Sequence, residues 1–286
     1  MPTSMDAFLN ILDIETIDPI LYRGISPNTS WQRVFGGQVI GQALLAAQRT
    51  VEQERLVHSL HCYFMRPGDP NVPILYAVDR IRDGKSFTTR RVVASQRGDA
   101  IFSLEASFQA HEQGLEHQVD LPSGIPQPEE LLSLRQMLER MDNVPEPIRR
   151  YFKRDRPLEL RPVFPEHYTS TEKLPPVQHV WVKMQEPVED PRIQSAALAY
   201  LSDMTLLDTA TFPHGGGVFD PRLQMASLDH AMWFHRQDRL DDWILYTQDS
   251  PWAGSSRGFT RGALYTRAGL LIASTVQEGL MRLRTK

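Results

Sequence analysis

The chain has 286 residues, of which 41% are hydrophobic and 23% charged, a balance typical of a globular protein with a sizeable core. Its net charge of −4 argues against a dedicated nucleic-acid binder, which usually carries a strongly basic face. The single cysteine, Cys62, excludes an internal disulfide and fits a reducing compartment. Acidic residues interrupt the first apolar positions, and no stretch reaches the ~18 apolar residues that cross a membrane. We therefore expect a cytoplasmic protein without a membrane span.

Two segments are apolar on nearly every side, 35–48 (FGGQVIGQALLAAQ) and 193–207 (IQSAALAYLSDMTLL). Both suit helices, and the second has clear start signals, because Asp190 can cap it and Pro191 can occupy its first position. A helix that is hydrophobic all round is buried on all sides. The pattern therefore predicts two cores, each built around one helix.

A run of strands is expected after each helix. The predicted strands cover 58–66, 73–82, 86–96 and 100–109, then 224–236, 243–249, 257–266 and 270–281. Gly98-Asp99 and Ala268-Gly269 are expected to form tight turns between the last two strands of each set. Short connections between strands indicate antiparallel sheets.

The two halves of the chain resemble each other, which indicates a tandem duplication. A shift of 171 in the numbering superimposes four pairs: Gly98 and Gly269, Arg90 and Arg261, Ile101 and Ile272, Ser103 and Ser274. Between the halves we expect helices over 128–141 and 147–153 and a strand over 179–184. We therefore predict one unit over 1–115, a partly helical linker over 116–174 and a second unit over 175–286.

Six segments carry a resemblance to a known family, in the family's order and over essentially the whole chain. They read WQRVFGGQVIGQAL (31–44), HSLHCYFMRPGD (58–69), RDGKSFTTRRV (82–92), AYLSDM (199–204), LDHAMWFHR (228–236) and STVQEGLMR (274–282). With these segments the chain resembles acyl-CoA thioesterase II, the TesB-like double-hotdog enzymes. The resemblance implies an α+β tandem hotdog, two antiparallel sheets that each wrap a long helix and run together. It also implies hydrolysis of medium- to long-chain fatty acyl-CoA, with no metal or organic cofactor, because CoA is part of the substrate. Exposed sheet edges or faces favour association, so a homodimer or homotetramer is expected.

The resemblance also implies three catalytic residues, Asp203, Ser227 and Gln277, which in the family jointly hold the attacking water. Asp203 interrupts an apolar helical segment, where a carboxylate is costly unless it is hydrogen-bonded. It is the member of this set that can take a proton, since Ser and Gln only orient. Without the resemblance, a carboxylate reaching solvent and two ordinary strand residues explain the same pattern. The counterpart of Gln277 in the first half is Ala106, so we expect one active site per chain.

Four residues are candidates for substrate binding: Gly36, Gly37, Arg90 and Arg91. The glycines match no phosphate-loop spacing, and a close backbone approach at the start of a buried helix explains them better. A backbone N–H there could stabilise the oxyanion. Arg90 and Arg91, together with Arg33, could meet the CoA phosphates, although a solvated charged face explains them equally well.

Several other catalytic or binding functions fit the sequence less well. The sequence GSSRG over 254–258 matches G-x-S-x-G, but the last histidine, His235, precedes it, whereas the nucleophile elbow needs its acid and histidine afterwards. No protease signature surrounds Cys62, and the histidine spacings suit no metal motif. A hotdog hydratase or dehydratase would centre on a histidine, His61 or His230. A non-catalytic acyl-CoA binder would have no need of the Asp, Ser and Gln set.

Overall fold

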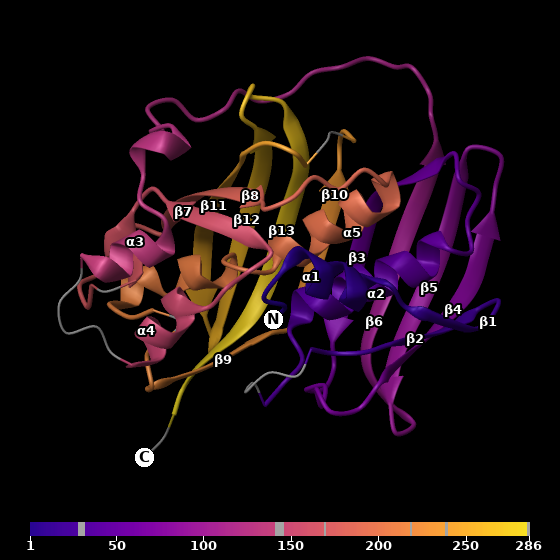
Figure 1. The fold of residues 1–286 in the computed structure, drawn as a ribbon, viewed down its shortest axis with the longest axis horizontal. Helices are drawn as coiled ribbons and strands as arrows, with labels where there is room; N and C mark the ends of the chain where they lie inside the picture. The colour runs from indigo at the N-terminus through magenta and orange to yellow at the C-terminus, as the bar shows by residue number, and fades with distance from the viewer. Residues whose placement is uncertain (28–31, 141–145, 169, 218, 238–239, 285–286) are drawn as a thin grey trace.

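The computed structural model describes residues 1–27, 32–140, 146–168, 170–217, 219–237 and 240–284 (Figure 1). Its strands form one 13-stranded antiparallel sheet in the order β1-β2-β4-β5-β6-β3-β10-β13-β12-β11-β8-β7, and β9 pairs with β13. The predicted sheets of the two halves are joined where β3 pairs with β10. Among the residues described, none of the helices has the length and apolar character that a bilayer crossing requires.

The elements follow the duplicated order predicted from the sequence. The first half contains α1 (Met5–Leu12), β1 (Glu15–Asp18), β2 (Leu21–Gly24), α2 (Gly36–Gln48), β3 (Arg55–Phe64), β4 (Ile74–Asp83), β5 (Phe87–Gln96) and β6 (Asp99–Ala110). The middle contains the 3-10 helices η1 (Pro128–Glu130) and η2 (Pro165–Tyr168), with α3 (Leu134–Glu139), α4 (Glu146–Lys153) and β7 (Leu158–Pro162). The second half contains β8 (Val177–Met184), α5 (Pro191–Ser202), η3 (Leu207–Ala210), η4 (Phe212–His214), β9 (Leu223–Ser227), β10 (Asp229–Phe234), β11 (Ile244–Gly254), β12 (Arg257–Thr266) and β13 (Leu271–Leu283).

The two central helices, α2 and α5, are buried and pack against each other in antiparallel fashion (Figure 1). A Cβ atom added to Gly37 would lie 2.3 Å from the carbonyl oxygen of Tyr200, and one added to Gly41 would lie 3.1 Å from that of Ala196. Glycine therefore allows the close backbone approach. As a result the N-terminus of α2 adjoins the C-terminus of α5, and the candidate site lies at this junction.

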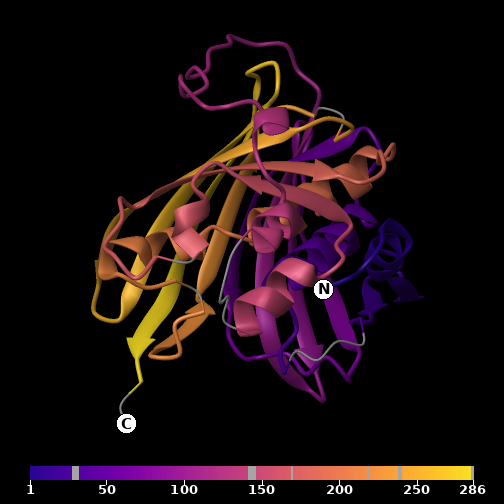
Figure 2. The same cartoon turned by 60° about the vertical axis from the view of Figure 1, so that its left-hand side comes forward.

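The prediction of two separate cores is wrong. A single cluster of buried residues includes Ile40 and Leu44 of α2 together with Ala197 and Leu201 of α5. The close contact between the helices merges what would otherwise be one core per half. A small second cluster around Trp181 packs against Leu121, Ile125 and Leu131 from the middle of the chain, so this part of the chain covers the sheet of the second half (Figure 2).

Three element boundaries differ from prediction for local reasons. The predicted helix 193–207 ends at Ser202, because the Met204 N–H bonds to the Leu201 carbonyl in a tighter turn. The predicted strand 224–236 is divided at Leu228, where the pairing with β13 changes register. The predicted helix 128–141 is a 3-10 turn followed by a helix capped by Ser133, and its predicted end at Met141 lies outside the described residues.

One tight turn lies where it was predicted and the other is shifted by one residue. Gly269 has a positive φ, and its N–H bonds to the Thr266 carbonyl, as expected for a turn at Ala268-Gly269. The other turn consists of Arg97 and Gly98, both with positive φ, so Asp99 already belongs to β6. The sequence pattern did not reveal α1, β1, β2 or β7. The domain boundaries at 115 and 175 stay a prediction.

Candidate active site

The predicted catalytic residues meet at the wall of a cavity of about 700 Å³ between the two halves. Asp203 is the residue that ends α5, Ser227 is the last residue of β9, and Gln277 lies on β13. The first half contributes Gly36, at the start of α2, to the same cavity. Apolar side chains from both halves line much of the remainder, among them Val39, Phe64, Phe102, Leu207, Phe219 and Met225.

The three side chains form one hydrogen-bonded set. The Gln277 amide donates to Ser227 Oγ (2.7 Å), and Ser227 Oγ donates to Asp203 Oδ1 (3.5 Å, a long contact). The amide of Gln277 and the backbone N–H of Gly37 also bond to the Asp203 carboxylate. A Cβ atom on Gly36 would lie 2.7 Å from Asp203 Oδ2. Glycine at position 36 is therefore what allows the carboxylate to approach the first turn of α2.

The environment of Asp203 makes its carboxyl suited to proton transfer near neutral pH. Burial raises the pKa of Asp203 to about 7, although the hydrogen bonds from Gly37, Gln277 and Ser227 act in the opposite direction. The N-terminal end of α2 also favours the ionised form. A general base is most effective when its pKa lies near the working pH. Its position at the cavity wall and its raised pKa make Asp203 the candidate general base of the site.

His230 is a member of the site that the sequence analysis treated only as a rival base. Its Nδ1 lies 3.0 Å from Gln277 Oε1 and its Nε2 lies 2.9 Å from Ser202 Oγ. Burial lowers the pKa of His230 to about 4, so the ring is neutral at pH 7. A neutral ring that donates through Nδ1 to Gln277 Oε1 turns the amide nitrogen of Gln277 toward Ser227 and Asp203. His230 thus fixes the orientation of the side-chain amide of Gln277.

Comparison with known proteins shows which family the chain resembles. The family model for acyl-CoA thioesterase matches residues 148–280, and the model for the acyl-CoA thioesterase N-terminal domain matches residues 26–109. Acyl-coenzyme A thioesterase 8 of Mus musculus is 42% identical, over 96% of this chain and 88% of its own. Acyl-CoA thioesterase 2 of Haemophilus influenzae is 37% identical, over 99% of each chain.

The chain belongs to the acyl-CoA thioesterase family.

A solved structure supports the assignment of this thioesterase to the double-hotdog fold. The acyl-CoA thioesterase II TesB2 from Mycobacterium marinum is 42% identical and superimposes with a TM-score of 0.80, over 96% of this chain and 98% of its own. The resemblance inferred from the six sequence segments is confirmed, and so is the tandem hotdog. Trp31, the first residue of those segments, lies outside the described residues.

The structure does not support the phosphate contact predicted for Arg90, because its side chain bonds within the first half of the thioesterase. Arg90 is only 2% exposed. Its guanidinium donates to the side chain and carbonyl of Thr50, the carbonyls of Arg82 and Thr89 and the carboxylate of Asp83. These bonds use all five of its N–H groups. Arg91 is exposed on β5 and does not line the cavity.

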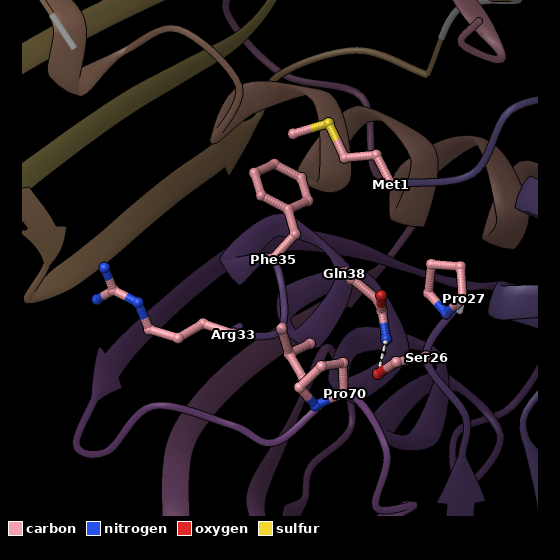
Figure 3. A pocket seen from close by; sticks show the side chains of 8 residues that line it. Met1, Ser26, Pro27, Arg33, Phe35, Gln38 and Pro70 are labelled. Carbon is pink, nitrogen blue, oxygen red and sulfur yellow. Dashed lines mark hydrogen bonds between the residues drawn. The ribbon is translucent and has the colours of Figure 1, made fainter. Parts of the chain in front are cut away.

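Other arginines of the thioesterase do line the cavity: Arg33, Arg66, Arg150 and Arg154. The last two come from α4 and the residues after it, so the middle of the chain contributes to the site. Figure 3 shows a recess beside the cavity, where Gln38 donates to Ser26 Oγ (2.9 Å) and Arg33 extends away from that pair. Sequence spacing had suggested Arg33 alone of these four.

The alternative chemistries do not fit the geometry of the thioesterase. Ser255 and Ser256 form the positive-φ turn of a hairpin between β11 and β12, whereas a nucleophile elbow leads from a strand into a helix. His61 is exposed and packs edge-on against Trp233. Cys62 is buried, and burial raises the pKa of its thiol well above the usual value, which disfavours the thiolate. Within the described part of the chain, no three His, Cys, Asp or Glu side chains are grouped so as to hold a metal ion.

Proposed function

We propose that this chain hydrolyses medium- to long-chain fatty acyl-CoA to free fatty acid and CoA, with a water molecule activated by Asp203, Ser227 and Gln277. The observation that carries the proposal is the Asp203 carboxylate, with its raised pKa, held by Ser227, Gln277 and Gly37 at the wall of the cavity. The chain's membership of the acyl-CoA thioesterase family supplies the substrate class. The large and mostly apolar cavity suits a fatty acyl chain.

In the proposed reaction the water oxygen forms a bond to the thioester carbonyl carbon while Asp203 takes one water proton. The carbonyl electrons move onto the oxygen, which becomes an oxyanion. When the intermediate collapses, the carbon–sulfur bond breaks and the CoA thiolate leaves. The proton held by Asp203 passes to that sulfur, so the products are the free acid and CoA with its thiol. Ser227 and Gln277 hold the water and carry no net proton.

The N-terminus of α2 is the proposed source of oxyanion stabilisation. The Gly37 N–H is already bonded to Asp203, whereas Gly36 lines the cavity one residue earlier in the same turn. The first N–H groups of a helix have no partner within the helix and lie at the positive end of its dipole. A donor of this kind next to the base stabilises the negative charge that develops on the carbonyl oxygen.

The arginines at the cavity are the proposed contacts for the CoA phosphates. Arg33 and Arg66 are exposed at the start of α2 and after β3, and Arg66 also donates to the Ala100 carbonyl. Guanidinium groups bind phosphate through paired hydrogen bonds. We expect Arg33→Ala to raise KM several-fold with little change in kcat, whereas Arg91→Ala, outside the cavity, leaves both unchanged.

Two further proposals concern the state of the protein. The buried, free thiol of Cys62 is compatible with the cytoplasm as the compartment. Exposed aromatic side chains such as Tyr63 (66% exposed) and Trp252 (45%) favour the homodimer or homotetramer expected from the sequence. Light scattering of the purified chain decides the second proposal.

The test of the catalytic proposal is thiol release from saturated acyl-CoAs with chains from C4 to C18. Asp203→Asn is compared with the wild type and with Asp99→Asn, which removes an exposed carboxylate at the start of β6. We expect the first variant to fold and lose turnover by about a hundredfold or more, and the control to match the wild type. Near-normal turnover by Asp203→Asn would refute the assignment of the base. No release from any substrate by the wild type would refute the hydrolysis itself and make hydration of an enoyl-CoA the next assay.

A further inference from the structure

Ser202, the last residue of α5, does not line the cavity, yet its hydroxyl group contacts the ring of His230. The side chain is fully buried. Its Oγ lies 2.9 Å from His230 Nε2 and 2.9 Å from the carbonyl oxygen of Ala199. A serine hydroxyl has one proton and donates it to one of these two neighbours. The choice between them determines which nitrogen of His230 carries the proton of the ring.

The ring of His230 is neutral, because it is buried against uncharged partners. It is only 1% exposed, and its two bonding partners are the amide of Gln277 and the hydroxyl of Ser202. A charge in such surroundings is costly, and burial lowers the pKa of His230 to about 4. A neutral imidazole has one nitrogen that donates a hydrogen bond and one that accepts.

The neighbouring groups identify Nε2 of His230 as the accepting nitrogen. The amide nitrogen of Gln277 bonds to Ser227 Oγ and to the Asp203 carboxylate, so its oxygen faces the ring. That oxygen lies 3.0 Å from Nδ1 and can only accept, so Nδ1 carries the proton. Nε2 is then a buried acceptor that needs a donor, and the Ser202 hydroxyl lies within reach.

The opposite direction of the Ser202 hydroxyl would disturb the base. If the proton pointed to the Ala199 carbonyl, the neutral ring would have to donate through Nε2, and a bare Nδ1 would face the amide oxygen of Gln277. Two acceptors at that distance repel each other, so the amide would turn over and direct its oxygen toward Asp203. The carboxylate would then lose the amide donor that holds it.

Tyr246 holds the end of α5 so that Ser202 meets the ring. The Tyr246 hydroxyl donates to the Ser202 carbonyl (2.8 Å), and Thr275, 3.0 Å away, therefore donates to the Tyr246 oxygen. We propose that Ser202 is a positioning residue: its hydroxyl donates to Nε2, selects the tautomer of His230 with the proton on Nδ1, and so fixes the amide of Gln277. The inference rests on the proposed function, because it concerns how the same site is kept in its active arrangement.

The tautomer is tested directly by nitrogen-15 NMR of the histidine rings at pH 7, with the signals of His230 assigned by their loss in His230→Phe. We expect the wild-type ring to carry its proton on Nδ1 and to have a bare Nε2. In Ser202→Ala, Nε2 has lost its donor, so part of the ring population should move the proton to Nε2. A wild-type ring with its proton on Nε2, or on both nitrogens, would overturn the inference.

The effect on catalysis is tested by thiol release from dodecanoyl-CoA. The matched control is Ser195→Ala, since Ser195 is also buried on α5 and donates to a backbone carbonyl, that of Pro191 (2.9 Å). We expect Ser202→Ala to lower kcat about fivefold with little change in KM, and the control to match the wild type. Added to His230→Phe, Ser202→Ala should cause no further loss, because its effect passes through the ring. Circular dichroism checks that each variant is folded.

Two kinetic results would overturn the inference while hydrolysis itself stands. One is a wild-type kcat in Ser202→Ala. The other is the same fivefold loss when Ser202→Ala is added to His230→Phe, which would make the serine a structural residue independent of the ring. If the wild type releases no thiol from any acyl-CoA, the proposed function fails, and the NMR spectrum still decides the tautomer.

Discussion

Replacement of Asp203 by Asn should stabilise the protein while it removes activity, and the gain should depend on pH. The pKa of Asp203 is raised from 3.8 to about 7 in the folded chain. Below pH 3.8 the carboxyl is neutral in both states and has no differential effect on folding. As the pH rises, the unfolded chain ionises first, and the folded state loses stability until the pH passes about 7. Asn stays neutral over the whole pH range, so the variant does not lose this stability as the pH rises.

The size of this stabilisation follows from the shift in the pKa of Asp203. About three pKa units at 1.36 kcal/mol each correspond to at most about 4 kcal/mol at pH 8, compared with about 0.5 kcal/mol at pH 4. Water in the cavity reduces the upper figure, so a gain of roughly 2–4 kcal/mol is expected at pH 8. This gain in the free energy of unfolding is measured by urea unfolding at both pH values. The proteins compared are the wild type, Asp203→Asn and the exposed control Asp99→Asn. An equal or lower stability of Asp203→Asn at pH 8 would show that burial does not penalise the charge of Asp203.

Three further predictions concern the same junction. Because the base must be ionised, kcat/KM for acyl-CoA should rise with pH through a midpoint near 7 and then level off; a profile that stays flat down to pH 5 contradicts this. His230→Phe should lower kcat about tenfold or more with little change in KM, because Gln277 Oε1 loses its hydrogen-bond donor. The side-chain amide of Asn can replace the Nδ1 donor, so His230→Asn should restore part of the rate. Gly37→Ala should destabilise the chain by about 2 kcal/mol or more, since the new methyl would meet the carbonyl oxygen of Tyr200, whereas Gly114→Ala, with open space around it, should be neutral in thermal unfolding.

Much of the fold could be predicted because its signals are local. The apolar helices α2 and α5 and the alternating strands of both halves have clear periodicity, and Asp190 caps α5 as expected. The points at which helices end and strands divide were harder to predict. The end of α5 at Ser202 depends on packing of η3 against β11 to β13, and the division at Leu228 depends on the register of β13, which no local pattern reveals.

The site was predictable in part for the same reason. Asp203 stood out as a carboxylate in an apolar segment, but Ser227 and Gln277 were found only through the family resemblance. The structure does not support Arg90 as a phosphate contact, and the sequence could not show this, because it does not distinguish a buried arginine with five bonds from a solvent-facing one. His230 orients Gln277 across two strands, and such cross-strand relations depend on a register that only the structure provides.

The antiparallel helix pair explains why one site per chain is expected. The pairing of α2 with α5 creates two junctions, each between the N-terminus of one helix and the C-terminus of the other. At the first junction Asp203 ends α5 beside the start of α2, and Gln277 faces it from β13. At the second, Arg49 ends α2, and the guanidinium of the buried Arg90 bonds to the next residue, Thr50. A cation at the end of α2 is favoured by the helix dipole but cannot accept a proton from water. The duplicated fold thus supplies two equivalent places, and the proposed base, Asp203, comes from the second half of the chain and lies at the first of them.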